Sequence, residues 1–326
     1  MSRKAKIIGA GYFVPEKRLT NADLEKMVDT SDEWIVRRTG IKERRIADEN
    51  TYTSDLAYEA AVRALKNANT KPEELDMILV STVTPDMFTP SVSCMVQSRL
   101  GAVNASAMDI NTACTGFISV LITANQFIAT GFYQKILVIG AETLTHMTDF
   151  KDRNTCILFG DGAGAVVVEG SDREGVLSGF MAADGSGGHV LTSLAFRNDE
   201  AEVAKRVSGR KETLWMDGSE VLKFAVRKMA SAVEEVLSRA ALTLDDLSLI
   251  IPHQANIRIV TGAAKRLGVS MDKMIVNIDR LGNIGSGCIP IALCEALEEG
   301  RIKPGDKVAL VAMGGGLTWG AVIIEF

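Results

Sequence analysis

The stretch KPEELDMILVSTVTP, residues 71–85, returns in altered form as LTLDDLSLIIPHQAN, residues 242–256, about 172 positions later. Each stretch follows an amphipathic segment and places a short acidic turn before a run of Ile, Leu and Val. An apolar run of this length, bounded by turn signals, is typical of a strand buried on both faces. The repeat therefore predicts two related α/β units in one chain.

Two further pairs of stretches repeat in the same order. SRLGAVNASAMDINTACTGF (98–117) matches KRLGVSMDKMIVNIDRLGNIGSGC (265–288), and FYQKILVIGAE (132–142) matches KPGDKVALVAMGGG (303–316). Three matches in one order favour a duplicated α/β unit over a solenoid, whose repeats are shorter. We expect a first half over residues 1–172 and a second half over residues 173–326.

The composition is typical of a water-soluble globular protein. The 326 residues are 47% hydrophobic and 24% charged, with a formal net charge of -5. No apolar run reaches the ~18 residues of a membrane span, and the first residues lack the apolar core of a signal peptide. We therefore expect a cytoplasmic protein that does not bind membranes, and the acidic net charge disfavours general nucleic-acid binding.

Several other classes of site are disfavoured. The five cysteines are an odd number without C-x-x-C spacing, which argues against disulfides and a zinc ribbon, and no histidine cluster predicts a metal. The opening IIGAGYFVPE (7–16) resembles a dinucleotide fingerprint, but Val14 replaces the third glycine and Pro15 blocks the expected helix. The charge-dense segment 195–213 is expected to be a surface excursion.

Cys114 is the first candidate for chemistry. In DINTACTGF (109–117) it stands where an apolar strand gives way, through a turn, to an apolar helix. A helix N-terminus favours a thiolate, so we expect a pKa below the usual value of about 8.5. This makes Cys114 a candidate nucleophile, whereas the alternative is an inert buried cysteine.

His253 and Asn283 lie in two other loops. His253 follows LSLIIP, where Pro252 ends a strand, and Asn283 lies in the glycine-rich turn RLGNIGSGCIP (280–290). Loops at the carboxyl ends of strands tend to meet at one crevice in α/β folds, so we expect both near Cys114. The alternatives are a core histidine satisfied by backbone and an ordinary turn asparagine.

Glycine-rich stretches at 160–170 and 314–320 lack the Walker pattern of a phosphate loop. We interpret both as tight entries into buried strands. In the second stretch, backbone N–H groups of consecutive glycines are also suited to hold a developing oxyanion, because no Cβ obstructs them.

Together, the motifs resemble the 3-oxoacyl-[acyl-carrier-protein] synthase III family of thiolase-like condensing enzymes, over the whole chain and in order. They are DTSDEWIVRRTGIKERR (29–45), NTACTGF (111–117), FGDGAGAVVVEG (159–170), IPHQANIRI (251–259), GNIGSG (282–287) and GGGLTWG (314–320). The resemblance implies a thiolase-like α/β fold of five layers, α-β-α-β-α, and a homodimer with an active site in each subunit.

The resemblance also implies roles for the candidate residues. Cys114 matches the nucleophile that takes the acyl group from acyl-CoA, and His253 and Asn283 match the pair that binds the thioester carbonyl of malonyl-acyl-carrier protein. The backbone N–H groups of Cys114 and Gly315 match a second oxyanion site. Acyl-CoA and the carrier protein are substrates, and no cofactor or metal is implied.

Two further groups of residues match binding surfaces of the family. Around coenzyme A and its pantetheine arm the matching residues are Trp34, Arg38, Arg153 and Asn256. The basic face expected to dock the acidic carrier protein comprises Lys223, Arg258, Lys265 and Arg266. Without the motif context, these charges would be interpreted as a solvated surface.

The chain departs from the family pattern in two places. It has GNIGSGC (282–288) where many members have GNTSAAS, so that Ile284 and Cys288 replace polar residues. Thr89 stands where a phenylalanine often closes the acyl pocket, which predicts room for primers longer or more branched than acetyl, although Phe88 is available to fill the gap.

Three alternatives stay open. A relative that primes a polyketide or specialised pathway would share these motifs. A thiolase-type synthase would need a base for the acetyl methyl group, for which Cys288 is the candidate. A non-catalytic acyl-CoA-binding protein would keep the fold without acylating Cys114.

Overall fold

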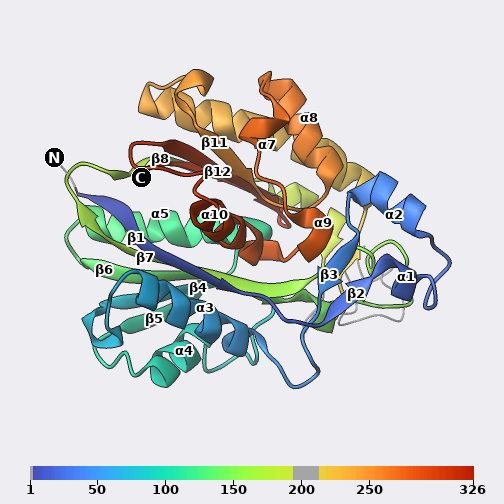
Figure 1. Cartoon of the computed structure of the whole chain (residues 1–326), viewed down its shortest axis with the longest axis horizontal. Coiled ribbons are helices and arrows are strands. Elements are labelled where there is room, and N and C mark those ends of the chain that lie inside the picture. The colour runs from blue at the N-terminus through green and yellow to red at the C-terminus, as the bar shows by residue number, and fades with distance from the viewer. Residues whose placement is uncertain (1–2, 194–212) are drawn as a thin grey trace.

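The computed structural model describes residues 3–193 and 213–326, and it contains two main β-sheets (Figure 1). The segment expected at 195–213 to be a surface excursion lies almost wholly outside the described residues. No helix in the described ranges is long and apolar enough to cross a membrane.

The first sheet has five strands. In spatial order they are β1 (Lys4–Phe13), β7 (Asp161–Ser171), β6 (Lys135–Thr143), β4 (Met77–Ser81) and β5 (Ser106–Ile110). β4 is parallel to β5 and β6, and every residue of β4 is buried. This confirms the prediction from its apolar run, because an inner parallel strand is covered on both faces.

The second sheet repeats this order with four strands. They are β8 (Gly175–Ala183), β13 (Thr318–Glu325), β12 (Lys307–Gly314) and β11 (Leu249–Pro252). β11 pairs in parallel with β12, as β4 does with β6. In both sheets the next two pairs are antiparallel: β12 with β13 and β13 with β8, as β6 with β7 and β7 with β1. The matching topology confirms the duplicated α/β architecture.

Helices complete the five expected layers (Figure 1). Two cover the outer face of the first sheet, two lie between the sheets, and two cover the outer face of the second sheet. In that order the pairs are α3 (Thr53–Asn67) and α4 (Val92–Leu100), α5 (Gly116–Ala129) and α10 (Cys288–Glu298), and α7 (Gly218–Ala240) and α8 (Ile257–Leu267). The central pair is apolar on most sides, as a helix between two sheets must be.

Short elements surround the end of the molecule where the connecting loops gather. They are β2 (Arg18–Thr20), α1 (Asn21–Leu24), α2 (Asp32–Thr39), β3 (Glu43–Arg45), β9 (Leu191–Thr192), β10 (Trp215–Met216) and α9 (Ile278–Leu281). β2 pairs with β3 and β9 with β10. The fully buried Arg44 on β3 donates to the carbonyls of Leu19 and Ile157, which ties these elements together.

Glycines let the central helix α10 approach the first sheet closely. A Cβ on Gly164 of β7 would lie 2.7 Å from the backbone nitrogen of Ile291 in α10. A Cβ on Gly140 of β6 would collide with the carbonyl oxygen of Ser286, just before that helix. The stretch 160–170, interpreted above as a tight entry into a buried strand, lies almost wholly within β7, where Gly164 permits this close packing. Gly140 in turn lets the loop before α10 lie against the first half of the chain.

Candidate active site

A cavity of about 1310 Å³ lies where loops of the two halves meet, and Cys114, His253 and Asn283 all line it. Cys114 comes from the first half, whereas His253 and Asn283 come from the second. The structure therefore brings together three candidates that are up to 169 positions apart in sequence.

Cys114 occupies a tight turn rather than the first turn of the α-helix. A short 3-10 helix spans Ala113–Thr115, and α5 begins at Gly116. Ala113 has a φ of 50°, a left-handed conformation that is uncommon for a residue with a side chain and that is typical of functional turns. A Cβ on Gly116 would collide with the Ser81 hydroxyl, so the turn is pressed against the end of β4.

The expectation of a lowered pKa at Cys114 is wrong for the resting protein. Burial raises the pKa of the thiol above its ordinary value, and the neighbouring Cys288 and Glu142 raise it further. Desolvation disfavours the charged form of the thiol, and here it outweighs the favourable helix N-terminus. The thiol is therefore protonated at neutral pH and must lose its proton as it reacts.

His253 lies at the carboxyl end of β11, as the sequence predicts. Its backbone N–H donates to the carbonyl of Val311 on β12 at 2.8 Å, and only 1% of the residue is exposed. Burial lowers the pKa of the imidazole to about 4, because the charged form is desolvated. A neutral ring at physiological pH donates from one nitrogen, as an oxyanion-binding group requires.

Asn283 is fixed by both its backbone and its side chain. Its backbone N–H donates to the carbonyl of Leu158 at 2.9 Å, and its own carbonyl accepts from Gly160 at 2.9 Å. The side-chain Oδ1 accepts from the N–H of Gly285 at 2.9 Å. Since the amide oxygen is held within the loop, the NH₂ group is left to donate into the cavity.

Ile284 and Cys288, which depart from the family pattern, support the Asn283 loop through a sulfur hydrogen bond and apolar packing. Cys288 accepts from the N–H of Ile284 at 3.1 Å, and its sulfur lies 3.7 Å from Oδ1 of Asn283. Ile284 packs in a small apolar cluster with Leu281, Cys288 and Ile291. Burial raises the pKa of Cys288 to about 12, so it is a poor candidate for a general base.

The glycine-rich turn after β12 lies against the cysteine turn. A Cβ on Gly314 would lie 2.7 Å from the backbone nitrogen of Cys114, and Gly315 lines the cavity. The Thr318 hydroxyl lies 3.0 Å from the carbonyl oxygen of Gly315 and 2.9 Å from the Thr115 hydroxyl. These bonds set the positions of the Cys114 and Gly315 backbones relative to each other.

The residues expected around coenzyme A lie at the mouth of this cavity. Trp34, Arg38 and Asn256 line it. Arg153 does not line it, but its guanidinium lies 4.6 Å from the Trp34 ring, on which Arg38 also stacks at 4.9 Å. Arg153 also pairs with Asp29 at 3.4 Å. Asn256 caps α8 by accepting from the N–H of Arg258 at 2.9 Å.

The residues of the expected basic face are exposed on α7 and α8. Lys223 pairs with Glu220 at 2.8 Å, and Lys265 and Arg266 lie in the last turn of α8. Arg258, at the start of α8, is exposed and also lines the cavity. The basic face therefore adjoins the cavity mouth at Arg258.

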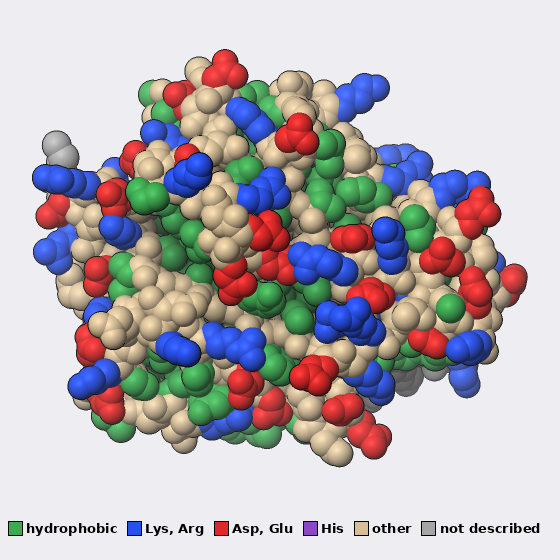
Figure 2. Space-filling view, in the orientation of Figure 1, with side chains coloured by type: hydrophobic (Ala, Val, Ile, Leu, Met, Phe, Trp, Pro, Cys, Tyr) green, Lys and Arg blue, Asp and Glu red, His purple; other side chains and the backbone are tan. Residues whose placement is uncertain are grey.

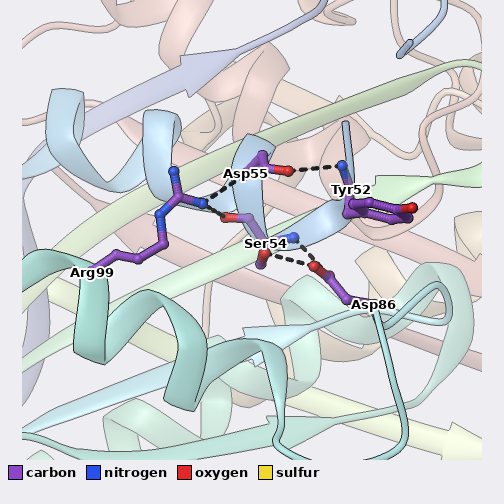
Figure 3. A network of polar contacts seen from close by, with 5 residues as sticks. All are labelled: Tyr52, Ser54, Asp55, Asp86 and Arg99. Carbon is purple, nitrogen blue, oxygen red and sulfur yellow. Dashed lines mark hydrogen bonds and ion pairs between the residues drawn. The ribbon is translucent and has the colours of Figure 1, made fainter. Parts of the chain in front are cut away.

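Phe88, and not Thr89, is among the cavity-lining residues. Their loop is anchored by a polar network (Figure 3). Asp86 accepts from the backbone N–H of Ser54 at 2.9 Å and from its hydroxyl at 2.6 Å. Beside this pair, Asp55 pairs with Arg99 at 2.7 Å. The network attaches the loop to the start of α3 and fixes its path along the cavity.

Sequence reasoning missed Glu142, which also lines the cavity although the residue is fully buried. It lies near the end of β6, in a run where its neighbours are apolar or small. An acidic residue at the end of an otherwise apolar predicted strand is the signal that would have singled it out.

Known proteins resemble this chain over its full length. Residues 108–185 match the protein family described as "3-Oxoacyl-[acyl-carrier-protein (ACP)] synthase III", and residues 237–326 match its C-terminal part. The beta-ketoacyl-[acyl-carrier-protein] synthase III of Caldanaerobacter subterraneus subsp. tengcongensis is 54% identical over 323 residues, 99% of this chain and 98% of that protein.

Solved structures of this family are also similar to the chain over nearly its full length. The 3-oxoacyl-[acyl-carrier-protein] synthase III from Aquifex aeolicus VF5 superimposes with a TM-score of 0.92 at 47% identity, covering 99% of this chain and 100% of that one. The priming beta-ketosynthase from the R1128 polyketide biosynthetic pathway superimposes with a TM-score of 0.91 at 32% identity, covering 99% of this chain and 97% of that one.

The raised pKa of Cys114 predicts how the thiol reacts with an alkylating reagent. Its rate of modification by iodoacetamide should keep rising between about pH 6 and 9, because the thiolate fraction grows throughout that range. Peptide mass spectrometry measures the rate, and Cys114→Ser identifies the modified peptide. A rate that levels off below about pH 7 would show a low-pKa thiolate instead.

Proposed function

The chain belongs to the 3-oxoacyl-[acyl-carrier-protein] synthase III family, and we propose that Cys114, His253 and Asn283 carry out its reaction. The enzyme is an acyltransferase that performs the initiating condensation of fatty acid synthesis. Acyl-CoA and malonyl-acyl-carrier protein give 3-oxoacyl-acyl-carrier protein, CoA and CO₂. The observation that carries the residue assignment is the shared cavity, which three side chains from opposite halves line.

In the first half-reaction, the sulfur of Cys114 attacks the thioester carbonyl of acyl-CoA. A bond forms between the sulfur and the acyl carbon, the bond to the CoA sulfur breaks, and the thiol proton ends on CoA. The backbone N–H groups of Cys114 and Gly315 stabilise the oxyanion that develops on the carbonyl oxygen. The close approach of Gly314 to the Cys114 nitrogen supports this pairing of donors.

In the second half-reaction, the thioester oxygen of malonyl-acyl-carrier protein accepts hydrogen bonds from the His253 ring and the Asn283 amide. Loss of CO₂ leaves an enolate, whose carbon attacks the acyl-cysteine carbonyl. The Cys114 thiolate leaves and takes one proton from solvent. The low pKa of His253 suits this step because the ring donates without carrying a charge.

His253→Ala should separate the two half-reactions. The variant should still gain the mass of the acyl group on incubation with acyl-CoA, because Cys114 and its backbone donors are intact. Release of CO₂ from malonyl-acyl-carrier protein should fall roughly 100-fold or more, the usual cost of one oxyanion donor.

Mass spectrometry of the intact protein and trapping of labelled CO₂ are the two measurements. Cys114→Ala is the control that abolishes the mass gain. Unchanged CO₂ release in a folded His253→Ala variant would contradict the role of the ring. Absence of the mass gain in the wild type would favour a non-catalytic acyl-CoA-binding protein.

Coenzyme A is proposed to bind at the mouth of the cavity. The two guanidiniums that stack on Trp34 support a site for a flat aromatic base and its phosphates, because indole offers a stacking face and arginine suits phosphate. Asn256 at the cavity wall is placed to contact the pantetheine arm.

The primer pocket is proposed to accept acyl groups longer or more branched than acetyl. Thr89 replaces a bulkier ring, although Phe88 lines the cavity from the neighbouring position. The rate of condensation with a series of straight and branched acyl-CoA primers tests this proposal. We expect at least one longer primer to match acetyl-CoA, whereas strict selectivity for acetyl-CoA would show that Phe88 closes the pocket.

The acidic carrier protein is proposed to dock on the basic residues of α7 and α8. Figure 2 shows basic side chains over the part of this face where α8 and α2 lie. These elements carry exposed Arg258, Lys265 and Arg266 on α8 and Arg37 on α2. The chain as a whole has a net charge of -5, so such a local patch acts mainly by steering the encounter with the carrier protein. Because salt screens this attraction, the effect should be greatest at low ionic strength.

The enzyme is proposed to act as a cytoplasmic homodimer. β5 is an edge strand of the first sheet, and large apolar side chains are exposed on and near it, among them Val103 at 74% and Met108 at 36%. An exposed edge strand of this kind offers a template for pairing with a second copy. Its five free thiols suit a reducing compartment. Light scattering of the chain in solution measures the oligomeric state.

A further inference from the structure

Glu142 is a buried acid with no cationic partner among the described residues. One carboxyl oxygen, Oε2, lies within hydrogen-bond distance of three donors on the loop after β4. They are the Thr82 hydroxyl at 3.1 Å, the Val83 N–H at 3.0 Å and the Thr84 hydroxyl at 2.8 Å. The Val83 N–H can only donate and both hydroxyls are able to donate, so Oε2 is suited to be the oxygen that carries no proton.

The other oxygen, Oε1, faces Ser286 in the loop that carries Asn283, and it accepts a long hydrogen bond of 3.4 Å from the Ser286 backbone N–H. The Ser286 hydroxyl oxygen lies 2.8 Å from Oε1 and also 2.9 Å from the carbonyl oxygen of Ser81. A carbonyl oxygen only accepts, and the single hydroxyl proton serves one neighbour at a time. If Glu142 were ionised, one of these short contacts would join two acceptors. A proton on Oε1 satisfies both, because Oε1–H donates to Ser286 and Ser286 donates to Ser81.

We propose that Glu142 is held as a neutral carboxylic acid in the resting enzyme, and that its bond to Ser286 positions the Asn283 loop beside Cys114. Glu142 and Ser81 belong to the first half of the chain and Ser286 to the second, so this chain of bonds joins the two halves at the site. The inference rests on the function proposed above for Asn283. Glu142 is a positioning residue, since it acts through Ser286.

The surroundings of Glu142 favour its neutral form. Burial raises the pKa of Glu142 above its ordinary value of 4.5, and the titratable groups that face it are the Cys114 and Cys288 thiols, which burial keeps uncharged. A charged carboxylate in this poorly solvated pocket would repel the negative charge that develops on the enolate and on the departing thiolate. A neutral acid supplies the same hydrogen bonds without that repulsion.

Glu142→Gln tests the proposal, because an amide reproduces a neutral acid with one acceptor and one donor group. We expect the variant to fold and to keep both half-reactions within about threefold of the wild type. If Glu142 were instead ionised in the wild type, the substitution would remove a charge on which the site depends. A folded variant whose rate of decarboxylation is lowered roughly 100-fold would therefore overturn the proposal.

The pH dependence of stability gives a second readout. A carboxyl group whose pKa is raised on folding contributes stability that is complete below 4.5 and is lost as pH rises through the folded-state pKa. Thermal unfolding should therefore show the glutamine variant gaining stability relative to the wild type as pH rises. A difference that does not change with pH would contradict a neutral Glu142.

Glu295→Gln is the matched control. Glu295 is also buried, but its carboxylate forms a bidentate pair with Arg280 at 2.7 and 2.8 Å. Loss of that charge leaves Arg280 without its partner, so this variant should be less stable than the wild type at neutral pH. The contrast between the Glu142→Gln and Glu295→Gln variants separates a buried acid without a cationic partner from one that is paired with a cation.

Infrared spectroscopy of the wild type labelled with ¹³C-glutamate keeps the proposal testable if a variant fails to fold. A protonated glutamate band at neutral pH is expected, and its absence overturns the proposal even if the enzyme condenses its substrates. The glutamate label separates this band from that of Asp161, another buried acid whose pKa is raised.

Ser286→Ala tests the positioning role. Acylation of Cys114 should persist while decarboxylation falls roughly tenfold or more, because only the Asn283 loop loses its anchor. Equal rates in Ser286→Ala and the wild type would remove that role. Failure of the wild type itself to release CO₂ would instead count against the function proposed for Asn283, and the infrared band would still decide the state of Glu142.

Discussion

The site depends on one contact, the close packing of the loop before α10 against the first sheet. Gly140 on β6 leaves no room for a Cβ beside the Ser286 carbonyl, and Gly116 leaves none beside Ser81. A side chain on Gly140 would push the two halves apart, and one on Gly116 would push the cysteine turn away from the end of β4. Because Asn283 lies in that loop and Cys114 lies next to Gly116, this packing sets the distance between nucleophile and oxyanion donor.

Low polarity around the site explains the protonation states that the structure favours. Burial raises the pKa of the Cys114 and Cys288 thiols and of Glu142, and it lowers that of His253. The two thiols and the His253 ring are therefore neutral at physiological pH, and Glu142 is proposed to be neutral as well. Hydrogen bonds act most strongly in such surroundings, so charge that develops on a substrate oxygen is met by donors that carry no competing charge.

Much of the fold was predictable because its signals are local. The apolar runs at β4 and β11 mark buried parallel strands, and their repetition in one order reveals the duplication. His253 and Asn283 were predictable for the same reason, since each follows a recognisable strand or glycine-rich turn. The roles assigned to them came from the resemblance to a family, and their local sequence alone left ordinary structural alternatives open.

What the sequence did not predict depends on contacts between distant residues. The direction of the Cys114 pKa shift depends on desolvation and on Cys288, which is 174 positions away. Glu142 was missed because its partner Ser286 lies 144 positions further along. Phe88 rather than Thr89 lines the cavity because of the path of their loop, which Asp86 and Ser54 fix from different elements.

The central claim is that the second half of the chain stabilises the enolate independently of the nucleophile in the first half. Release of CO₂ from malonyl-acyl-carrier protein by Cys114→Ala, without any acyl-CoA, tests it most directly. We expect the variant to release CO₂ and to leave acetyl-acyl-carrier protein, with a proton from water on the enolate carbon. A folded Cys114→Ala variant that releases no CO₂ would contradict the claim.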